Sequence, residues 1–124
     1  LMNSPHILMV IAPNAFRDEE LLTPRALFKE KGWVVDTVST LTGTAIGMLG
    51  AAESVDRTIE EVLPEPYQAI VVVGGMGAIE HLWQNTPLHH ALQTVARKGN
   101  VVAGICLSAA ALANAGVLQG KRAT

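Results

Sequence analysis

Residues 100–115 read NVVAGICLSAAALANA, so an apolar run, a cysteine and an alanine-rich stretch follow one another directly. Asn100 to Ile105 is rich in apolar and β-branched residues and predicts a buried strand, whereas Leu107 to Ala115 predicts a helix. Cys106 therefore lies where a strand passes into a helix. A sharp turn of this kind exposes a side chain at the carboxyl edge of a parallel sheet.

Cys106 has two interpretations at this turn. In the functional one, the first amides of the following helix favour the thiolate and can also hold an oxyanion formed by attack on a carbonyl. In the structural one, the cysteine is a small buried hydrophobic residue, as lone cysteines often are. Its position on the turn favours a reactive thiol.

A second strand of the same kind precedes a run of glycines. Gln68 to Val73 (QAIVVV) is continuously apolar after its first residue, and Gly74-Gly75-Met76-Gly77 follows at once. Backbone N–H groups of such a turn can face an anion at the same sheet edge. The run matches neither the dinucleotide fingerprint nor the P-loop, and by itself it is more often only a tight turn.

The rest of the chain alternates strands and helices. Pro24 is expected to kink the first helix or delay its start, and Thr86 is expected to cap the helix that has Pro87 at its first position. The alternation predicts an α/β three-layer sandwich with a mostly parallel sheet flanked by helices. The predicted strands are 6–12, 33–39, 68–73 and 100–105, and the predicted helices are 18–31, 58–63, 87–98 and 107–115. Residues 78–84 are expected to form a helical turn, and 40–55 a hairpin or irregular excursion.

Length and composition limit the classes of protein. With 124 residues, 49% of them hydrophobic, we expect one domain over 1–124. The net charge of −2 provides no basic surface for nucleic acid or an anionic membrane, and no apolar run approaches a membrane span. One cysteine cannot form an internal disulfide, and the first residues lack the basic region of a signal peptide, so a cytoplasmic protein is expected.

Several titratable residues are candidate partners of the thiol. Asp18, Glu19 and Glu20 open the first helix at the same sheet edge, where acids are also favoured by the helix dipole. One of them could turn toward Cys106, where an ionised carboxylate would disfavour the thiolate and a protonated one would donate a hydrogen bond to it. Of the four histidines, only His81 lies close after the glycine turn. No spacing resembles a metal site, so neither a metal nor another cofactor is expected.

Together these motifs resemble the ThiJ/PfpI superfamily, which includes protein deglycases and archaeal intracellular proteases with a class I glutamine amidotransferase-like domain. Residues 15–21, with Pro24 behind them, resemble the acidic start of the family's first helix. Residues 70–75 resemble its strand and glycine turn, 101–106 its nucleophile elbow, and 113–124 the segment after it.

The resemblance implies a flavodoxin-like fold, homodimers or larger oligomers, and roles for particular residues. Cys106 would be the nucleophile, and Glu20, four residues before Pro24, the carboxyl that hydrogen-bonds it. The amides of Gly75 and Leu107 would form the oxyanion hole. The family's domains continue with further strands and a final helix, so we expect the domain to extend past Thr124 and its C-terminal part to be missing here.

One departure from the family pattern bears on activity. The protease-like branch has histidine directly after the cysteine, whereas this chain has Leu107. The position lacks an adjacent general base, which argues against a peptidase. In other branches the histidine comes from sequence further on.

Three functions remain open from the sequence. The first is a cysteine-dependent hydrolase-type enzyme, of the protease/amidase, glyoxalase III or deglycase class, acting on a small carbonyl or amide substrate. The second is an oxidative-stress sensor or chaperone-like module, with little turnover, in which the Cys106 thiolate is oxidised to a sulfinate. The third is a regulatory domain that binds a ligand or protein without catalysis.

Overall fold

Four parallel strands form the central sheet of the computed structural model, which describes residues 4–124. Their order is β3 (Val34–Val38), β1 (His6–Val10), β6 (Ala69–Val72) and β7 (Val101–Gly104). Apolar residues dominate β1 and β6, the two inner strands, because both of their faces are covered. The predicted parallel α/β sheet is confirmed.

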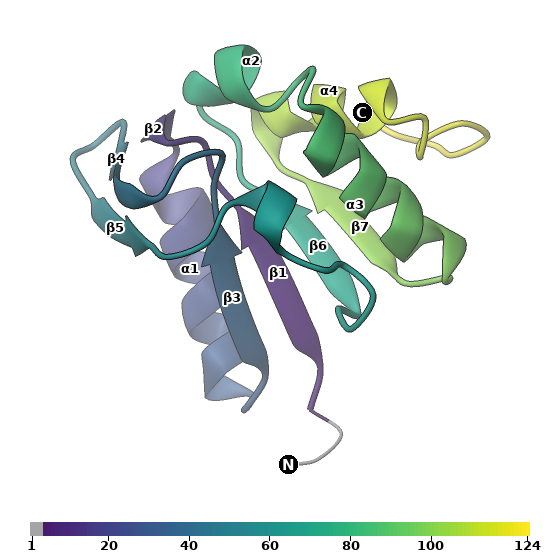
Figure 1. Cartoon of the computed structure of the whole chain (residues 1–124), viewed down its shortest axis with the longest axis horizontal. Helices are drawn as coiled ribbons and strands as arrows, with labels where there is room; N and C mark the ends of the chain where they lie inside the picture. The colour runs from purple at the N-terminus through teal and green to yellow at the C-terminus, as the bar shows by residue number, and fades with distance from the viewer. Residues whose placement is uncertain (1–3) are drawn as a thin grey trace.

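Successive residues of the inner strands enter two separate hydrophobic cores. Leu8 and Val10 of β1 pack beneath α3 (Thr86–Arg97) and α4 (Ala109–Asn114), whereas Ile7 and Met9 pack on the face covered by α1 (Asp18–Glu30). Figure 1 shows α1 behind the sheet and α3 in front of it. The three-layer sandwich is therefore confirmed, and it follows from the alternation of side chains along each strand.

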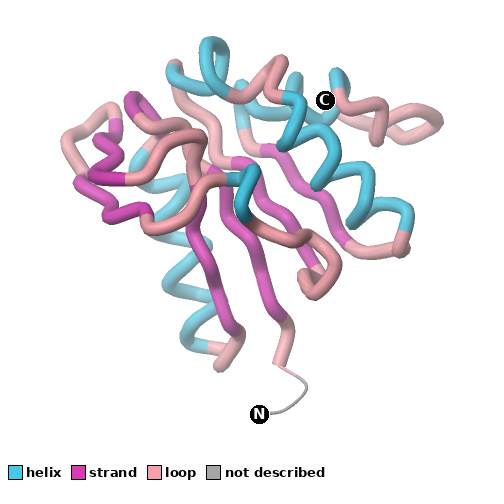
Figure 2. The backbone as a smooth tube through the Cα atoms, in the orientation of Figure 1, coloured by secondary structure: helices cyan, strands magenta, loops and turns pink. Residues whose placement is uncertain are grey.

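A second, smaller sheet stands beside the carboxyl ends of β1 and β3. It consists of β2 (Asn14–Phe16), which pairs in parallel with β4 (Gly43–Gly47), and β5 (Ala52–Val55), which pairs antiparallel with β4. The hairpin expected within 40–55 is thus present (Figure 2). β2 was not predicted, because a three-residue strand becomes visible only through its partner.

The short helices differ in length and type from their predictions. The segment 58–63 contains only the 3₁₀ turn η1 (Ile59–Glu61), and the helical turn predicted over 78–84 is α2 (Gly77–His81), which begins one residue earlier. The helix predicted over 107–115 begins as a second 3₁₀ turn, η2 (Cys106–Ser108), and continues as α4. The sharp turn at the strand end tightens the first helical residues.

One prediction about helix starts is confirmed and another is wrong. α1 begins at Asp18, as the range 18–31 predicted, and Pro24 does not delay it, because a proline within the helix removes a single hydrogen bond while the helix packs on the sheet through Leu21. Thr86 is the first residue of α3 rather than its cap. The side chain of Asn85 accepts a hydrogen bond of 2.8 Å from the Leu88 N–H and fills that role.

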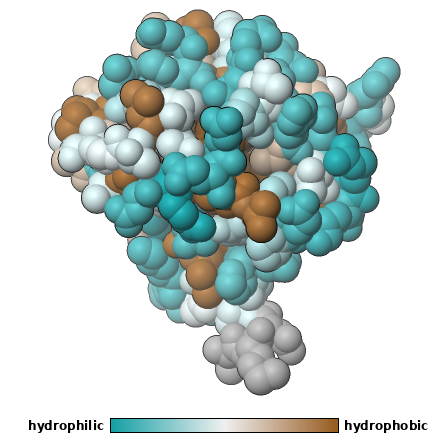
Figure 3. Space-filling model, in the orientation of Figure 1, coloured by the Kyte–Doolittle hydropathy of each residue, from teal (hydrophilic) through white to brown (hydrophobic). Residues whose placement is uncertain are grey.

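Hydrophilic side chains cover most of the face that carries α3, with hydrophobic ones exposed between them (Figure 3). Within residues 4–124, no helix is both long and apolar enough to cross a membrane.

Candidate active site

Cys106 lies on the turn between β7 and α4, with its side chain exposed. Its φ of 55° falls in the left-handed region, which residues with a Cβ adopt at a cost of about 1–2 kcal/mol. Such backbone strain persists only where surrounding contacts impose it, and it gathers at functional sites. The thiol is therefore held in a strained conformation at the carboxyl edge of the sheet.

Contacts on both sides of Cys106 hold this turn in place. On the strand side, the Ile105 N–H donates to the Val72 carbonyl at 3.0 Å. On the helix side, the buried Ser108 hydroxyl donates to the Val73 carbonyl at 2.7 Å, and the Trp83 Nε1–H donates to the Leu107 carbonyl at 2.7 Å.

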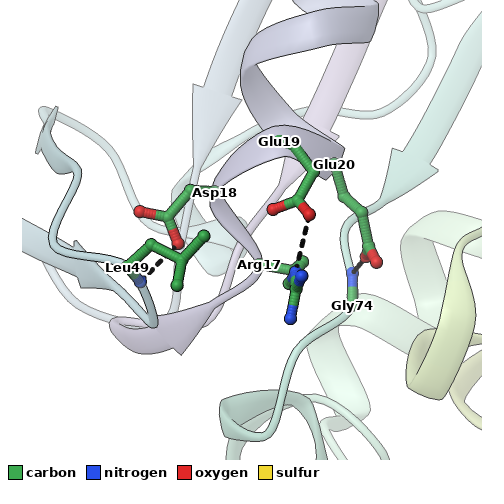
Figure 4. A network of polar contacts seen from close by, with 6 residues as sticks. All are labelled: Arg17, Asp18, Glu19, Glu20, Leu49 and Gly74. Carbon is green, nitrogen blue, oxygen red and sulfur yellow. Dashed lines mark hydrogen bonds and ion pairs between the residues drawn. The ribbon is translucent and has the colours of Figure 1, made fainter.

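Gly74 is where Glu20 and Cys106 approach each other. The Gly74 N–H donates to Glu20 Oε1 at 2.9 Å (Figure 4). A Cβ on Gly74 would stand 2.7 Å from that oxygen, 3.0 Å from the Cys106 Cβ and 2.5 Å from the Ile105 carbonyl oxygen. Only glycine leaves room for these three groups to converge, and the Glu20 carboxylate is thereby brought close to the cysteine.

Gly75 brings the same turn against the start of α1. Its φ is 106°, and a Cβ there would lie 2.5 Å from both the Ala15 carbonyl oxygen and the Arg17 nitrogen. Among residues 4–124, no acceptor binds the Gly75 N–H. This amide is free to bind an anion at the sheet edge that also carries Cys106 and the backbone of Leu107.

The three acids at the start of α1 point in different directions (Figure 4). Asp18 accepts the N–H groups of Leu49 and Ala51, each at 2.8 Å, and so fixes the β4–β5 hairpin. Burial raises the pKa of Asp18, but these hydrogen bonds outweigh it, and the pKa lies below its usual value. Glu20 is the acid that reaches the glycine turn.

Glu19 forms an ion pair with Arg17, and both side chains are exposed. The Arg17 Nε donates to Glu19 Oε2 at 2.8 Å. A hydrogen bond from its own backbone N–H and the one from Arg17 lower the pKa of Glu19. The hydrogen bond and the charge of Glu19 in turn raise the pKa of Arg17.

His81, the histidine that follows the glycine turn in the sequence, lies away from Cys106. It lines a cavity of about 210 Å³ together with Pro13, Asn14 and the segment 41–45. Its Nε2 is buried without a hydrogen-bond partner, 3.7 Å from Glu80 Oε2. The part of the chain that the structure describes holds no group of three or more metal-binding side chains.

The sequence did not identify the residues that hold the elbow. Trp83 bonds Leu107, 24 positions away, and Ser108 bonds Val73, 35 positions away. Contacts between residues so far apart leave no local pattern in the sequence. In the sequence, Gly74 is only one member of a glycine run. Its role at the point of approach depends on Glu20, which lies 54 positions away.

Comparison with known proteins shows what this arrangement belongs to. The model of the DJ-1/PfpI family matches residues 5–124 and so spans the glycine turn, the acidic helix start and the elbow. The chain belongs to the DJ-1/PfpI family. The family expectation and the flavodoxin-like fold are confirmed.

Among relatives of this DJ-1/PfpI chain, protein MJ0967 of Methanocaldococcus jannaschii is 50% identical over 99% of the chain and 60% of that protein. Deglycase PH1704 of Pyrococcus horikoshii is 34% identical over 94% of the chain and 70% of that protein. The crystal structure of a ThiJ/PfpI domain protein from Brachyspira murdochii superposes with a TM-score of 0.87 at 32% identity, covering 93% of this chain and 66% of the other. The chain thus spans about three fifths of the first relative's length.

Proposed function

We propose that this chain carries the nucleophile of a cysteine-dependent enzyme that acts on small carbonyl or amide compounds. The observation that carries the proposal is the approach of Glu20 Oε1 and the Cys106 Cβ to one point at Gly74, with the exposed thiol on a backbone of positive φ. A relative at 34% identity named a deglycase supports a carbonyl substrate. Activity of this class is the function the geometry favours.

The proposed chemistry begins with the Cys106 thiolate. Its sulfur attacks the aldehyde carbon of the substrate, a C–S bond forms, and the carbonyl π pair moves onto oxygen. The resulting oxyanion lies against the amides of Gly75 and Leu107, which stabilise it as hydrogen-bond donors. Glu20, with Oε1 fixed by Gly74, positions the thiol and exchanges a proton with it through the other oxygen.

Methylglyoxal turnover tests this proposal. We expect Cys106→Ser to lose at least about a hundredfold in kcat/KM, because a serine hydroxyl at neutral pH is a far weaker nucleophile than a thiolate. Glu20→Gln should lose about tenfold or more. Glu60→Gln, an exposed acid on η1, is the matched control and should retain full activity. Unchanged turnover in Cys106→Ser would refute the proposal.

Oxidation of Cys106 is the second candidate function, favoured by the exposure of the thiol. The elbow that would hold an oxyanion would also hold a sulfinate. Under this candidate, mild peroxide adds two oxygens to Cys106, as mass spectrometry of the tryptic peptide 99–121 would show. A thiol that remains unmodified under those conditions would remove this candidate.

A further inference from the structure

We propose that Arg17 makes the thiol site selective for anionic carbonyl compounds, above all small α-oxo carboxylates. This inference rests on the proposed function and names the substrate class of the same site. It depends on three observations: the position of Arg17, the N–H donors of its guanidinium that have no acceptor, and the hydrogen bonds that the nearby acids already accept.

The backbone of Arg17 is part of the site. Its N–H donates to the Gly74 carbonyl at 3.0 Å, and its nitrogen lies 2.5 Å from where a Gly75 Cβ would stand. Arg17 also immediately precedes α1, whose third residue is Glu20. The residue is therefore fixed between the glycine turn and the acidic helix start.

The side chain of Arg17 lies on the same side. Figure 4 shows its guanidinium on the side of α1 that carries Glu20 and Gly74, whereas Asp18 points the other way, toward Leu49. The side chain is 40% exposed, so an incoming solute can reach it. An exposed cation therefore lies on the side of α1 that carries Glu20 and Gly74.

The guanidinium has unused hydrogen-bonding capacity. Its Nε is bound to Glu19, and among residues 4–124 no acceptor binds the two terminal nitrogens. Their four N–H donors match the two oxygens of a carboxylate in the planar, bidentate geometry that arginine favours. Glu19 fixes the orientation of the group and leaves this outer edge to solvent.

The neighbouring carboxylates are already engaged by other groups. Asp18 accepts two N–H groups of the β4–β5 hairpin, and Glu20 accepts the Gly74 N–H. Arg17 thus has donors left for a ligand beside acids that already hold protein partners. A substrate with a carboxylate beside its aldehyde could place the acid on Arg17 and the carbonyl carbon near the Cys106 sulfur.

Alkylation of Cys106 tests the electrostatic part of the inference without needing turnover. Iodoacetate and iodoacetamide both react by thiolate attack on carbon, forming a C–S bond and releasing iodide, and they differ in charge. The quantity measured is the ratio of their second-order rate constants at Cys106, followed in peptide 99–121 by mass spectrometry.

We expect Arg17→Gln to lower the ratio of iodoacetate to iodoacetamide rates by about two- to fivefold, as removal of one charge at a solvated site predicts. Arg17→Lys should keep most of the ratio. Arg57→Gln, which removes an exposed arginine elsewhere, is the matched control and should match wild type. The difference should vanish at about 1 M salt, where screening acts within about 3 Å. An Arg17→Gln ratio equal to that of Arg57→Gln would overturn the inference.

Protection of Cys106 separates this inference from the proposed function. Glyoxylate and methylglyoxal present the same aldehyde beside a carboxylate and a neutral acetyl group, respectively, and the Cys106 thiolate adds reversibly to either aldehyde to give a hemithioacetal. Glyoxylate has no second carbonyl carbon to accept a hydride, so its binding is measured as protection of Cys106 from iodoacetamide rather than as turnover. We expect Arg17→Gln to weaken protection by glyoxylate about tenfold, with protection by methylglyoxal nearly unchanged. Equal losses of protection for both compounds would refute the selectivity. If wild type does not turn over methylglyoxal, the proposed function fails, and the alkylation ratio still decides whether Arg17 selects anions.

Discussion

Replacing Cys106 by glycine should stabilise the fold while it removes the thiol, because this residue has a φ of 55°. A residue with a Cβ in this region costs about 1–2 kcal/mol, whereas glycine adopts it freely. Glycine in turn loses more backbone entropy on folding, about 0.5–1 kcal/mol relative to alanine. We therefore expect Cys106→Gly to exceed Cys106→Ala by about 1 kcal/mol in the free energy of unfolding.

Urea unfolding followed by circular dichroism would measure this difference at constant m value. Comparison with Cys106→Ala separates the backbone effect from loss of the sulfur, since both variants lack the exposed thiol. Ala109→Gly, three residues later at a φ of −56°, is the control and should instead lose about 0.5–1 kcal/mol. If Cys106→Gly proves no more stable than Cys106→Ala, the turn is not strained and the reasoning fails.

Three further outcomes are expected from single contacts. Ser108→Ala should lower the free energy of unfolding by about 1–3 kcal/mol, because it leaves the buried Val73 carbonyl without its donor; chemical denaturation would show this. Asn85→Ala should lower the free energy of unfolding by about 1 kcal/mol, and Thr86→Ala should lower it clearly less, because Asn85 is the cap of α3. Melting curves of the two variants would test this, and a larger loss in Thr86→Ala would contradict it. Burial and the hydrogen bond to a carboxylate raise the pKa of Tyr67 to about 12, so stability present below pH 10 should be lost between pH 10 and 12. Titration of stability should show this loss in wild type and a much weaker one in Tyr67→Phe.

The architecture was predictable because it depends on short-range patterns. Four apolar or β-rich runs predicted the four strands of the parallel sheet, and each lies within or close to its expected range. A strand that is buried on both faces has a nearly continuous apolar sequence, and glycine and proline favour turns. The same logic placed Cys106 on the turn after β7.

The errors arose where a partner distant in the chain decides the local structure. β2 exists because it pairs with β4. Of the two effects expected from Pro24, the late start does not occur, because the inner face of α1 packs on the sheet from Asp18 onward. The choice between Thr86 and Asn85 as cap depends on which oxygen reaches the Leu88 N–H. Propensity alone favours either residue.

The sequence by itself determined the family, the parallel sheet and the position of the single cysteine at a strand end, because all three are recorded in the order and spacing of residues. Only the tertiary structure decided which acid serves the site. Asp18, Glu19 and Glu20 are consecutive and chemically similar, yet they bind the β4–β5 hairpin, Arg17 and Gly74 respectively. Successive helix positions point about 100° apart, so the surrounding segments assign each side chain a different partner.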